Sequence, residues 1–132
     1  MQITRQADYA IRAVRYLSTL EPSKRVATRD IAANQDIPAS FLAKIISQLT
    51  QDGILDTSRG AKGGVFLAKK PEEISLLEVV ESIDRKILLN ICVANSGKCS
   101  MEEDCPLKPI WCDAQNALVE KLRSTTFDQF SN

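Results

Sequence analysis

The sequence contains no histidine in its 132 residues. Histidine is the commonest general acid or base in enzymes and a frequent zinc ligand, so its absence argues against both kinds of site. A nucleotide-binding fingerprint and an obvious catalytic pair are also missing, and residues 60–64 lack the Gly-Lys-Ser/Thr ending of a phosphate loop. We therefore expect a protein that is not an enzyme and has no small-molecule substrate.

Long apolar runs are absent as well. No run approaches the roughly 20 residues that a membrane span requires, and residues 1–5 do not resemble a signal peptide. Apolar residues make up 44% of the chain and charged residues 26%, as in ordinary globular proteins. These features predict a cytoplasmic protein without membrane contact, in which thiols stay reduced.

The formal net charge is zero, but the charges are unevenly distributed. Residues 1–70 contain 11 lysines and arginines and 6 acidic residues, whereas residues 71–132 contain 6 and 11. A basic half beside an acidic half suggests that one half meets a polyanion, although chance clustering of solvated charges is the alternative. The distribution predicts two functional parts, residues 1–70 and residues 71–132.

Hydrophobic periodicity in the first part predicts three helices, over residues 6–20, 28–34 and 38–52. Short extended runs at 54–57 and 65–68 flank a segment with three glycines, which is typical of a hairpin. A helix–turn–helix followed by a basic hairpin is the plan of a winged helix. We therefore predict a mainly α fold with a small β-hairpin wing.

The second part begins with a capping box, Ser75 and Glu78, which predicts a helix whose apolar stripe ends at Ile83. Residues 84–105 show no periodicity, which in a compact domain indicates either disorder or function. A long helix over 106–123 follows, with a stripe close to a coiled-coil seam, and Thr125 with Asp128 is expected to cap a last turn. The stripe consists of Leu107, Trp111, Ala114, Leu118 and Leu122.

Residues suited to DNA lie on the outer face of the helix at 38–52. Small side chains there permit close approach to base edges, while serine and lysine can bond to bases or phosphates. Arg59 and Lys62 at the hairpin tip suit a minor groove or the backbone. The alternative is an ordinary solvated helix face. The predicted contact residues are Thr28, Ala39, Ser40, Ala43, Lys44, Ser47, Arg59 and Lys62.

Four cysteines cluster late in the chain, at Cys92, Cys99, Cys105 and Cys112. In a reduced compartment such clustering favours metal over disulfides, and structural zinc sites usually show close Cys-x-x-Cys pairs, which are missing here. Wider spacing suits an iron–sulfur cluster, whose irons take thiolates from several directions. Cys112, about two turns beyond Cys105, is either a further ligand or a packed thiol beside Trp111. The alternatives for the other three cysteines are that they are ordinary small apolar residues or that two of them form a redox thiol pair.

Three segments resemble the Rrf2 family of regulators, to which IscR and NsrR belong. They are residues 3–12 (ITRQADYAIR), residues 37–49 from Ile-Pro-Ala-Ser-Phe-Leu, and the hairpin at 58–67 (SRGAKGGVFL). Three cysteines before a tryptophan-bearing helix complete the resemblance, which covers nearly the whole chain. It implies a homodimer with one iron–sulfur cluster per subunit and a pseudo-palindromic double-stranded DNA operator.

The resemblance also bears on the fourth cluster ligand. In IscR-like members this ligand is a histidine three residues after the third cysteine, a position that Lys108 occupies here. In NsrR-like members an aspartate from the first helix of the other subunit completes a 4Fe–4S cluster, and Asp8 occupies that position. This implies Asp8 from the partner subunit and favours 4Fe–4S over 2Fe–2S, although a carboxylate near a helix start is often only a surface group. Ala43 replaces the glutamate of IscR-like recognition helices, so operator preference does not transfer.

The sequence therefore predicts an iron–sulfur transcription regulator, with repression expected, that senses nitric oxide, redox state or iron–sulfur status. Cluster assembly is expected to fix residues 84–105 and the last helix relative to the two wings. A cluster-free regulator that senses oxidation through its thiols is the first alternative. An electron-transfer or redox protein is the second.

Overall fold

The computed structural model describes residues 2–94, 100 and 102–130. Three helices come first, α1 (Arg5–Ser18), α2 (Thr28–Gln35) and α3 (Ala39–Gln51), followed by the strands β1 (Leu55–Ser58) and β2 (Gly64–Leu67). The second part contains η1 (Pro71–Glu73), α4 (Leu76–Asp84), α5 (Ile91–Ala94), η2 (Glu102–Asp104), α6 (Lys108–Ser124) and η3 (Phe127–Phe130). The order helix–helix–helix–hairpin confirms the predicted winged helix.

The ends of the first three helices follow from local chemistry. The Thr4 side chain accepts a hydrogen bond from the Ala7 backbone N–H and caps α1, which ends before Pro22. Pro38 precedes the first turn of α3, where its missing N–H costs nothing. Gly53 has a φ of 78° just beyond α3, a conformation that glycine adopts without strain.

The wing is antiparallel, with Leu55 opposite Leu67 and Ser58 opposite Gly64. Its second strand also bridges the segment before α2, because Val26 and Val65 exchange backbone hydrogen bonds of 3.0 and 2.8 Å. The hairpin is therefore fastened to the helical domain by main-chain atoms on its other edge as well.

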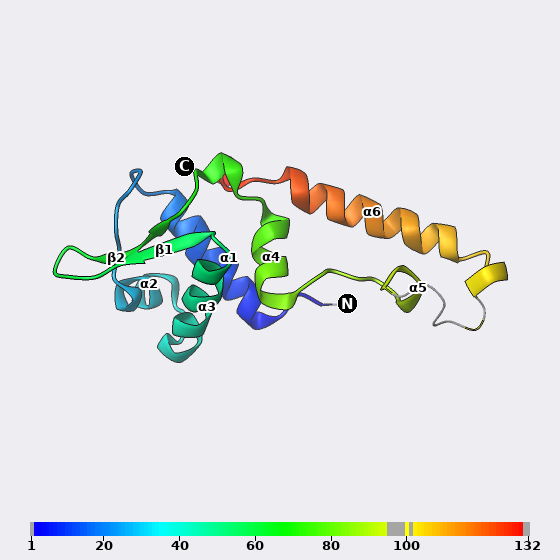
Figure 1. Cartoon of the computed structure of the whole chain (residues 1–132), viewed down its shortest axis with the longest axis horizontal. Helices are drawn as coiled ribbons and strands as arrows, with labels where there is room; N and C mark the ends of the chain where they lie inside the picture. Colours follow the sequence, from blue (N-terminus) through cyan, green and yellow to red (C-terminus); the bar gives the residue numbers. More distant parts are fainter. Residues whose placement is uncertain (1, 95–99, 101, 131–132) are drawn as a thin grey trace.

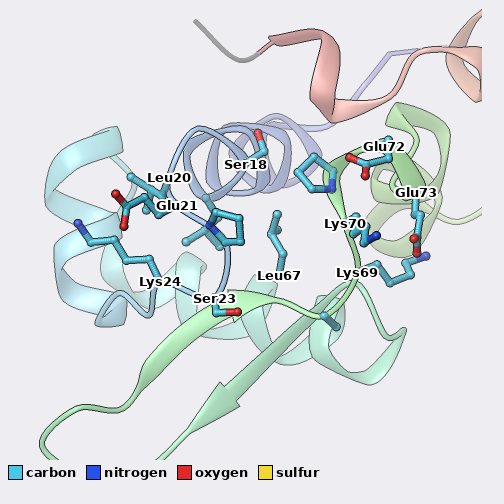
Figure 2. A pocket seen from close by; sticks show the side chains of 14 residues that line it. Ser18, Leu20, Glu21, Ser23, Lys24, Leu67, Lys69, Lys70, Glu72 and Glu73 are labelled. Atoms are coloured by element: carbon cyan, nitrogen blue, oxygen red, sulfur yellow. The ribbon is translucent and has the colours of Figure 1, made fainter.

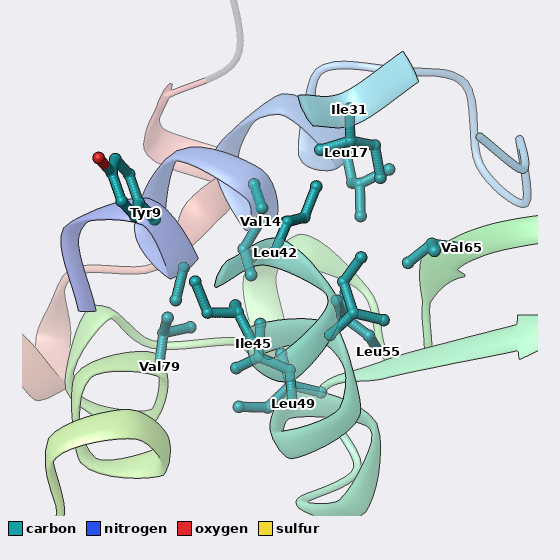
Figure 3. Packing of buried hydrophobic residues seen from close by; sticks show 14 of the residues in the cluster. Tyr9, Val14, Leu17, Ile31, Leu42, Ile45, Leu49, Leu55, Val65 and Val79 are labelled. Atoms are coloured by element: carbon teal, nitrogen blue, oxygen red, sulfur yellow. The ribbon is translucent and has the colours of Figure 1, made fainter. Parts of the chain in front are cut away.

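The main core lies where α1, α2, α3 and the wing meet (Figure 3). The predicted stripe of α3 is buried, and Ile74 and Val79 from the second part pack into the same core. Phe127 of η3 is fully buried there, and its ring lies 5.8 Å from that of Phe130. Phe127, near the end of the chain, thus packs into the core formed by α1, α2, α3 and the wing. The stripe of α3 consists of Leu42, Ile45, Ile46 and Leu49.

We expect Phe127→Ala to lower the free energy of unfolding by about 3–5 kcal/mol, because a fully buried ring would leave a cavity. Urea denaturation at a fixed protein concentration measures the loss. Phe130→Ala is the control, since Phe130 is only half-buried beside the same ring. Equal losses for the two variants would contradict the placement of Phe127.

Helix α6 extends away from this body, and α4 lies between the two (Figure 1). All of its residues are described, yet none is buried in the isolated chain. Leu118 and Leu122, with Val119, pack onto Leu77 and Val80 of α4. The C-terminal part of the predicted stripe therefore packs against α4, whereas Leu107 and Trp111, at its N-terminal end, are exposed.

Several local expectations are corrected. Residues 84–105 contain α5 and η2, which are too short to produce a periodic pattern. The last helix begins at Lys108, with a proline in its first turn, rather than at Pro106. Thr126, not Thr125, interacts with Asp128 at the start of η3. Ser75 caps α4 as expected, but Glu78 pairs with Lys69, so the capping box is only half formed. Among the described residues, no helix combines the length and apolar character of a membrane span.

Candidate DNA interface and cysteine site

The outer face of α3 is open to solvent because its opposite face anchors the helix in the core. Thr28 is half-buried and is the first residue of α2, the first helix of the helix–turn–helix. The arrangement suits a helix that enters a major groove. The predicted contact positions on α3, all of them exposed, are Ala39, Ser40, Ala43, Lys44 and Ser47.

The wing tip carries Arg59 and Lys62, and both side chains are exposed. Arg25 braces the wing at its base. Its guanidinium lies 4.8 Å from the centre of the Phe66 ring, and Nη1 donates to the Ser58 hydroxyl at 2.9 Å. The tip is thus held at its base while its cations remain in solvent.

Glycine is required where the wing meets the helical domain. Gly64 has a φ of 155°, and a Cβ there would lie 2.8 Å from the backbone of Val26. We expect Gly64→Ala to lower the free energy of unfolding by roughly 1–3 kcal/mol, because the wing must move off Val26. Gly53→Ala is the matched control: its φ of 78° is also positive, but no atom lies within 4 Å of the added Cβ. Similar losses in urea denaturation would show that backbone strain alone matters.

Asp8 lies in the first turn of α1, partly exposed, and its Oδ2 accepts a hydrogen bond from Arg12 at 2.8 Å. The Arg12 and Arg5 guanidinium groups lie 5.4 and 5.5 Å from the centre of the Tyr9 ring. Phe41 of α3 contacts the same ring, with centroids 6.2 Å apart. Asp8 therefore sits at the edge of a cluster that joins α1 to the recognition helix.

Two of the predicted cluster ligands lie at opposite ends of the cysteine segment. Cys92 is on α5, Cys105 immediately precedes the turn into α6, and both are half-buried free thiols. Cys99 lies outside the described residues. Within the described part, no group of three histidine, cysteine, aspartate or glutamate side chains could hold a metal ion. Helices α5 and α6 contact each other, so the short helix that carries Cys92 lies beside α6.

The start of this segment is attached to α6. The Gln115 side chain accepts from the Leu89 backbone N–H at 2.9 Å and donates to the carbonyl of Ile87. Ile87 is buried against Leu77 and Val80. The chain that leads to Cys92 is therefore fixed between α4 and α6. Cys112, in the second turn of α6, is a half-buried free thiol.

A polar connection between α3 and α4 has no counterpart among the sequence predictions. The Ser82 hydroxyl donates to Asp52 Oδ2 at 2.5 Å, and Gln48 Nε2 donates to the same oxygen at 3.0 Å. These bonds, first from Ser82 and then from Gln48, hold the pKa of the Asp52 carboxyl below its ordinary value. Because Asp52 and Ser82 are 30 residues apart, no sequence spacing could indicate the contact.

A groove of about 630 Å³ lies on another side of the molecule (Figure 2). It is bounded by the end of α1, the turn at 20–24 and residues 67–73, and Lys24, Lys70 and Glu73 are among its lining residues. None of the described residues that line it is a cysteine or belongs to α3. The groove is therefore separate from both candidate sites.

Comparisons with known proteins agree with this geometry. The family model described as "Rrf2: Iron-dependent Transcriptional regulator" matches residues 3–132. The transcriptional regulator NsrR of Geobacillus kaustophilus is 35% identical over 124 residues, which cover 94% of this chain and 80% of that protein. IscR of Pectobacterium carotovorum is 26% identical over 132 residues, which cover 100% of this chain and 80% of that protein.

Solved structures show the same fold. CymR, the global cysteine regulator of B. subtilis, superposes with a TM-score of 0.82 at 18% identity and covers 100% of this chain and 99% of its own. IscR of T. potens gives 0.74 at 21% identity, over 98% of this chain and 85% of its own. The relatives are transcriptional regulators and not enzymes. The chain belongs to the Rrf2 family of DNA-binding transcriptional regulators.

Proposed function

We propose that this protein is a homodimeric transcription repressor whose operator affinity is controlled by an iron–sulfur cluster. In this proposal Cys92, Cys99 and Cys105 of one subunit and Asp8 of the partner subunit hold the cluster. The observation that carries the proposal is the pair of free thiols, Cys92 and Cys105, at the two ends of one segment beside α6.

The donor chemistry fits such a cofactor. Thiolates are the usual ligands of iron–sulfur clusters, and a carboxylate can take a remaining position because each oxygen has two lone pairs. Arg12 bonds to one oxygen of Asp8 and so orients the carboxylate at the protein surface. The NsrR relative at 35% identity supports the NsrR-like ligand set and hence a 4Fe–4S rather than a 2Fe–2S cluster.

Pairing of two chains would bring Asp8 of one to the cysteines of the other. The start of α6, with Leu107 just before it, offers an apolar surface for this, since Leu107, Ile110 and Trp111 are 52%, 59% and 38% exposed. Side chains of this size are usually covered when they lie together on one helix. A second copy of the chain would cover them and place two recognition helices on one operator.

On the DNA side, we assign base and phosphate contacts to the outer face of α3, to Thr28 and to the wing tip. Small side chains on α3 allow close approach to the major groove, Lys44 can meet phosphate or guanine, and Arg59 and Lys62 can reach the backbone or a minor groove. Two such units must be spaced by about one helical turn of DNA, so a small change in subunit geometry alters affinity. The α3 contacts in this assignment are Ala39, Ser40, Ala43, Lys44 and Ser47.

The cluster supplies a group that nitric oxide, oxidants or iron shortage can modify or remove. The chain's own residues translate this into a change of shape. Cys92 and Cys105 draw α5 towards α6, Gln115 and Ile87 hold the leading segment against α4, and α4 packs on α3. Loss of the thiolate anchors frees this connection and lowers operator affinity.

Anaerobic purification followed by iron and sulfide analysis and a resonance Raman spectrum tests the proposal. Four irons and four sulfides per subunit are expected for a 4Fe–4S cluster. Two irons and two sulfides per subunit would indicate a 2Fe–2S cluster, and Asp8 would then lose its support as the fourth ligand. Colourless, iron-free protein that still binds its operator and responds to oxidants through its thiols would establish the cluster-free alternative.

A further inference from the structure

The last turn of α4 is a junction of three hydrogen-bonded connections, each to a different part of the molecule. Ser82 bonds to Asp52, at the end of α3. Asp84 accepts from the backbone N–H of Thr4 at 3.1 Å and from the Thr4 hydroxyl. Glu81 accepts from the backbone N–H of Ile87 at 3.4 Å, on the segment leading to Cys92.

The connection through Ser82 reaches Gln48 of α3 by way of Asp52. Asp52 Oδ2 accepts hydrogen bonds from both the Ser82 hydroxyl and the Gln48 amide, and the half-buried Gln48 directly follows Ser47, which is exposed on the outer face. One oxygen of Asp52 accepts from both donors. A shift of α4 that moves Ser82 therefore also changes the orientation of the Gln48 side chain. Apolar contacts between α3 and α4 alone would not orient a polar side chain in this way.

The connection through Asp84 reaches the turn that carries Asp8. Thr4 accepts from Ala7 through its hydroxyl and from Asp8 through its carbonyl, at 3.1 and 3.0 Å, while its own N–H and hydroxyl bond to Asp84. The first turn of α1 and the last turn of α4 are therefore held together by charged hydrogen bonds. The two proposed sources of cluster ligands are the turn that carries Asp8 and the cysteine segment. The first is bonded to α4 through Asp84 and the second through Glu81, three residues earlier.

The backbone leaves this junction in a strained conformation. Arg85 has a φ of 65° and a ψ of −164°, a combination that residues other than glycine rarely adopt. Its backbone N–H still bonds to the carbonyl of Glu81, so α4 ends there. The direction of the cysteine segment is consequently set by one residue at the end of α4.

We propose that Ser82 and Asp52 are positioning residues that set Gln48 and the end of the recognition helix according to the position of α4. Through them, operator affinity follows the state of the cysteine segment. This coupling rests on the proposed function, whereas the positioning of Gln48 does not. In this proposal the last turn of α4 couples the state of the cysteine segment to the position of Gln48 on α3.

The test compares Ser82→Ala with Ser82→Thr in the full-length protein, since the second variant keeps the hydroxyl. The probe is a duplex selected by the wild-type protein from a random-sequence library. Operator Kd is measured for protein reconstituted with iron and sulfide and for cluster-free protein at one salt concentration. We expect Ser82→Ala to reduce the ratio of the two Kd values roughly tenfold and Ser82→Thr to restore it. Thermal unfolding of each variant checks that the fold is retained.

A second readout does not need the cluster. In cluster-free protein, the side-chain amide signals of Gln48 in ¹⁵N spectra are expected to shift in Ser82→Ala and to return in Ser82→Thr. Asp52→Ala should reproduce the shift, and Asp56→Ala, which removes the same charge from β1, should not. Unchanged Gln48 signals together with an unchanged Kd ratio in Ser82→Ala would overturn the positioning proposal. Equal Kd values for loaded and cluster-free wild type would instead overturn the proposed function, and the Gln48 signals would then decide the positioning role alone.

Discussion

Cys105→Ser protein is expected to be purified without iron and sulfide under anaerobic conditions. Cys105 stands where the cysteine segment leads into α6, so under the proposed function its replacement removes one of the cluster ligands. Loss of one of four ligands commonly removes the metal site, because binding and local folding are coupled. Iron and sulfide analysis and the visible spectrum measure the first effect, and operator Kd with and without nitric oxide measures the second. We expect the response to nitric oxide to disappear.

Cys112→Ser is the matched variant for this experiment. Cys112 is also a half-buried free thiol, but it lies inside α6, one turn into the helix. With Asp8 as the fourth ligand, Cys112→Ser should retain iron and sulfide, while Asp8→Ala should lose them in part or whole. The reverse pattern, loss in Cys112→Ser and retention in Asp8→Ala, would make Cys112 the fourth ligand. Full retention in Cys105→Ser would exclude the proposed cysteine site.

The double variant Arg59→Ala/Lys62→Ala is expected to bind its operator at least roughly tenfold more weakly, and the slope of log K against log salt should fall by about 2. Both cations project from the wing tip, which Arg25 and the Val26 bridge hold in place, so their removal eliminates contacts without moving the wing. Titrations at three or more salt concentrations measure the slope. Weakening should be similar on specific and random duplexes, because phosphate contacts carry no sequence information.

Lys121→Ala/Arg123→Ala is the control for this charge change. It removes two exposed cations from the far end of the same chain, on α6, where Arg123 pairs only with its neighbour Glu120 among the contacts described. The control should leave the salt slope within error of the wild type. An equal fall in both double variants would mean that net charge, rather than the wing, determines the affinity.

Much of the winged helix could be predicted from the sequence because its elements are defined by short-range patterns. Apolar spacing predicts the helices that the structure shows as α1 and α3, and the glycines within 60–64 predict the hairpin. Each of these signals acts within a few residues. The family resemblance is confirmed by the match over residues 3–132.

The remaining features depend on contacts between distant residues. The packing of Phe127 into the first core, the division of the α6 stripe between α4 and solvent, and the Ser82–Asp52 bond all join segments that no local pattern relates. The short helix α5 gives no period to detect. Which residues hold the cluster and touch DNA stays a prediction, because ligands and bases are recognised only by an assembled surface.

The exposed start of α6 has a consequence for how much regulator a cell can keep. A newly made subunit that has not paired presents Leu107, Ile110 and Trp111 on a helix with little support from its own body. Quality-control proteases favour such accessible apolar helices, whereas the pairing proposed above would conceal them. Proteolysis would then remove unpaired subunits selectively. The protein would accumulate only when its concentration is high enough for pairs to form.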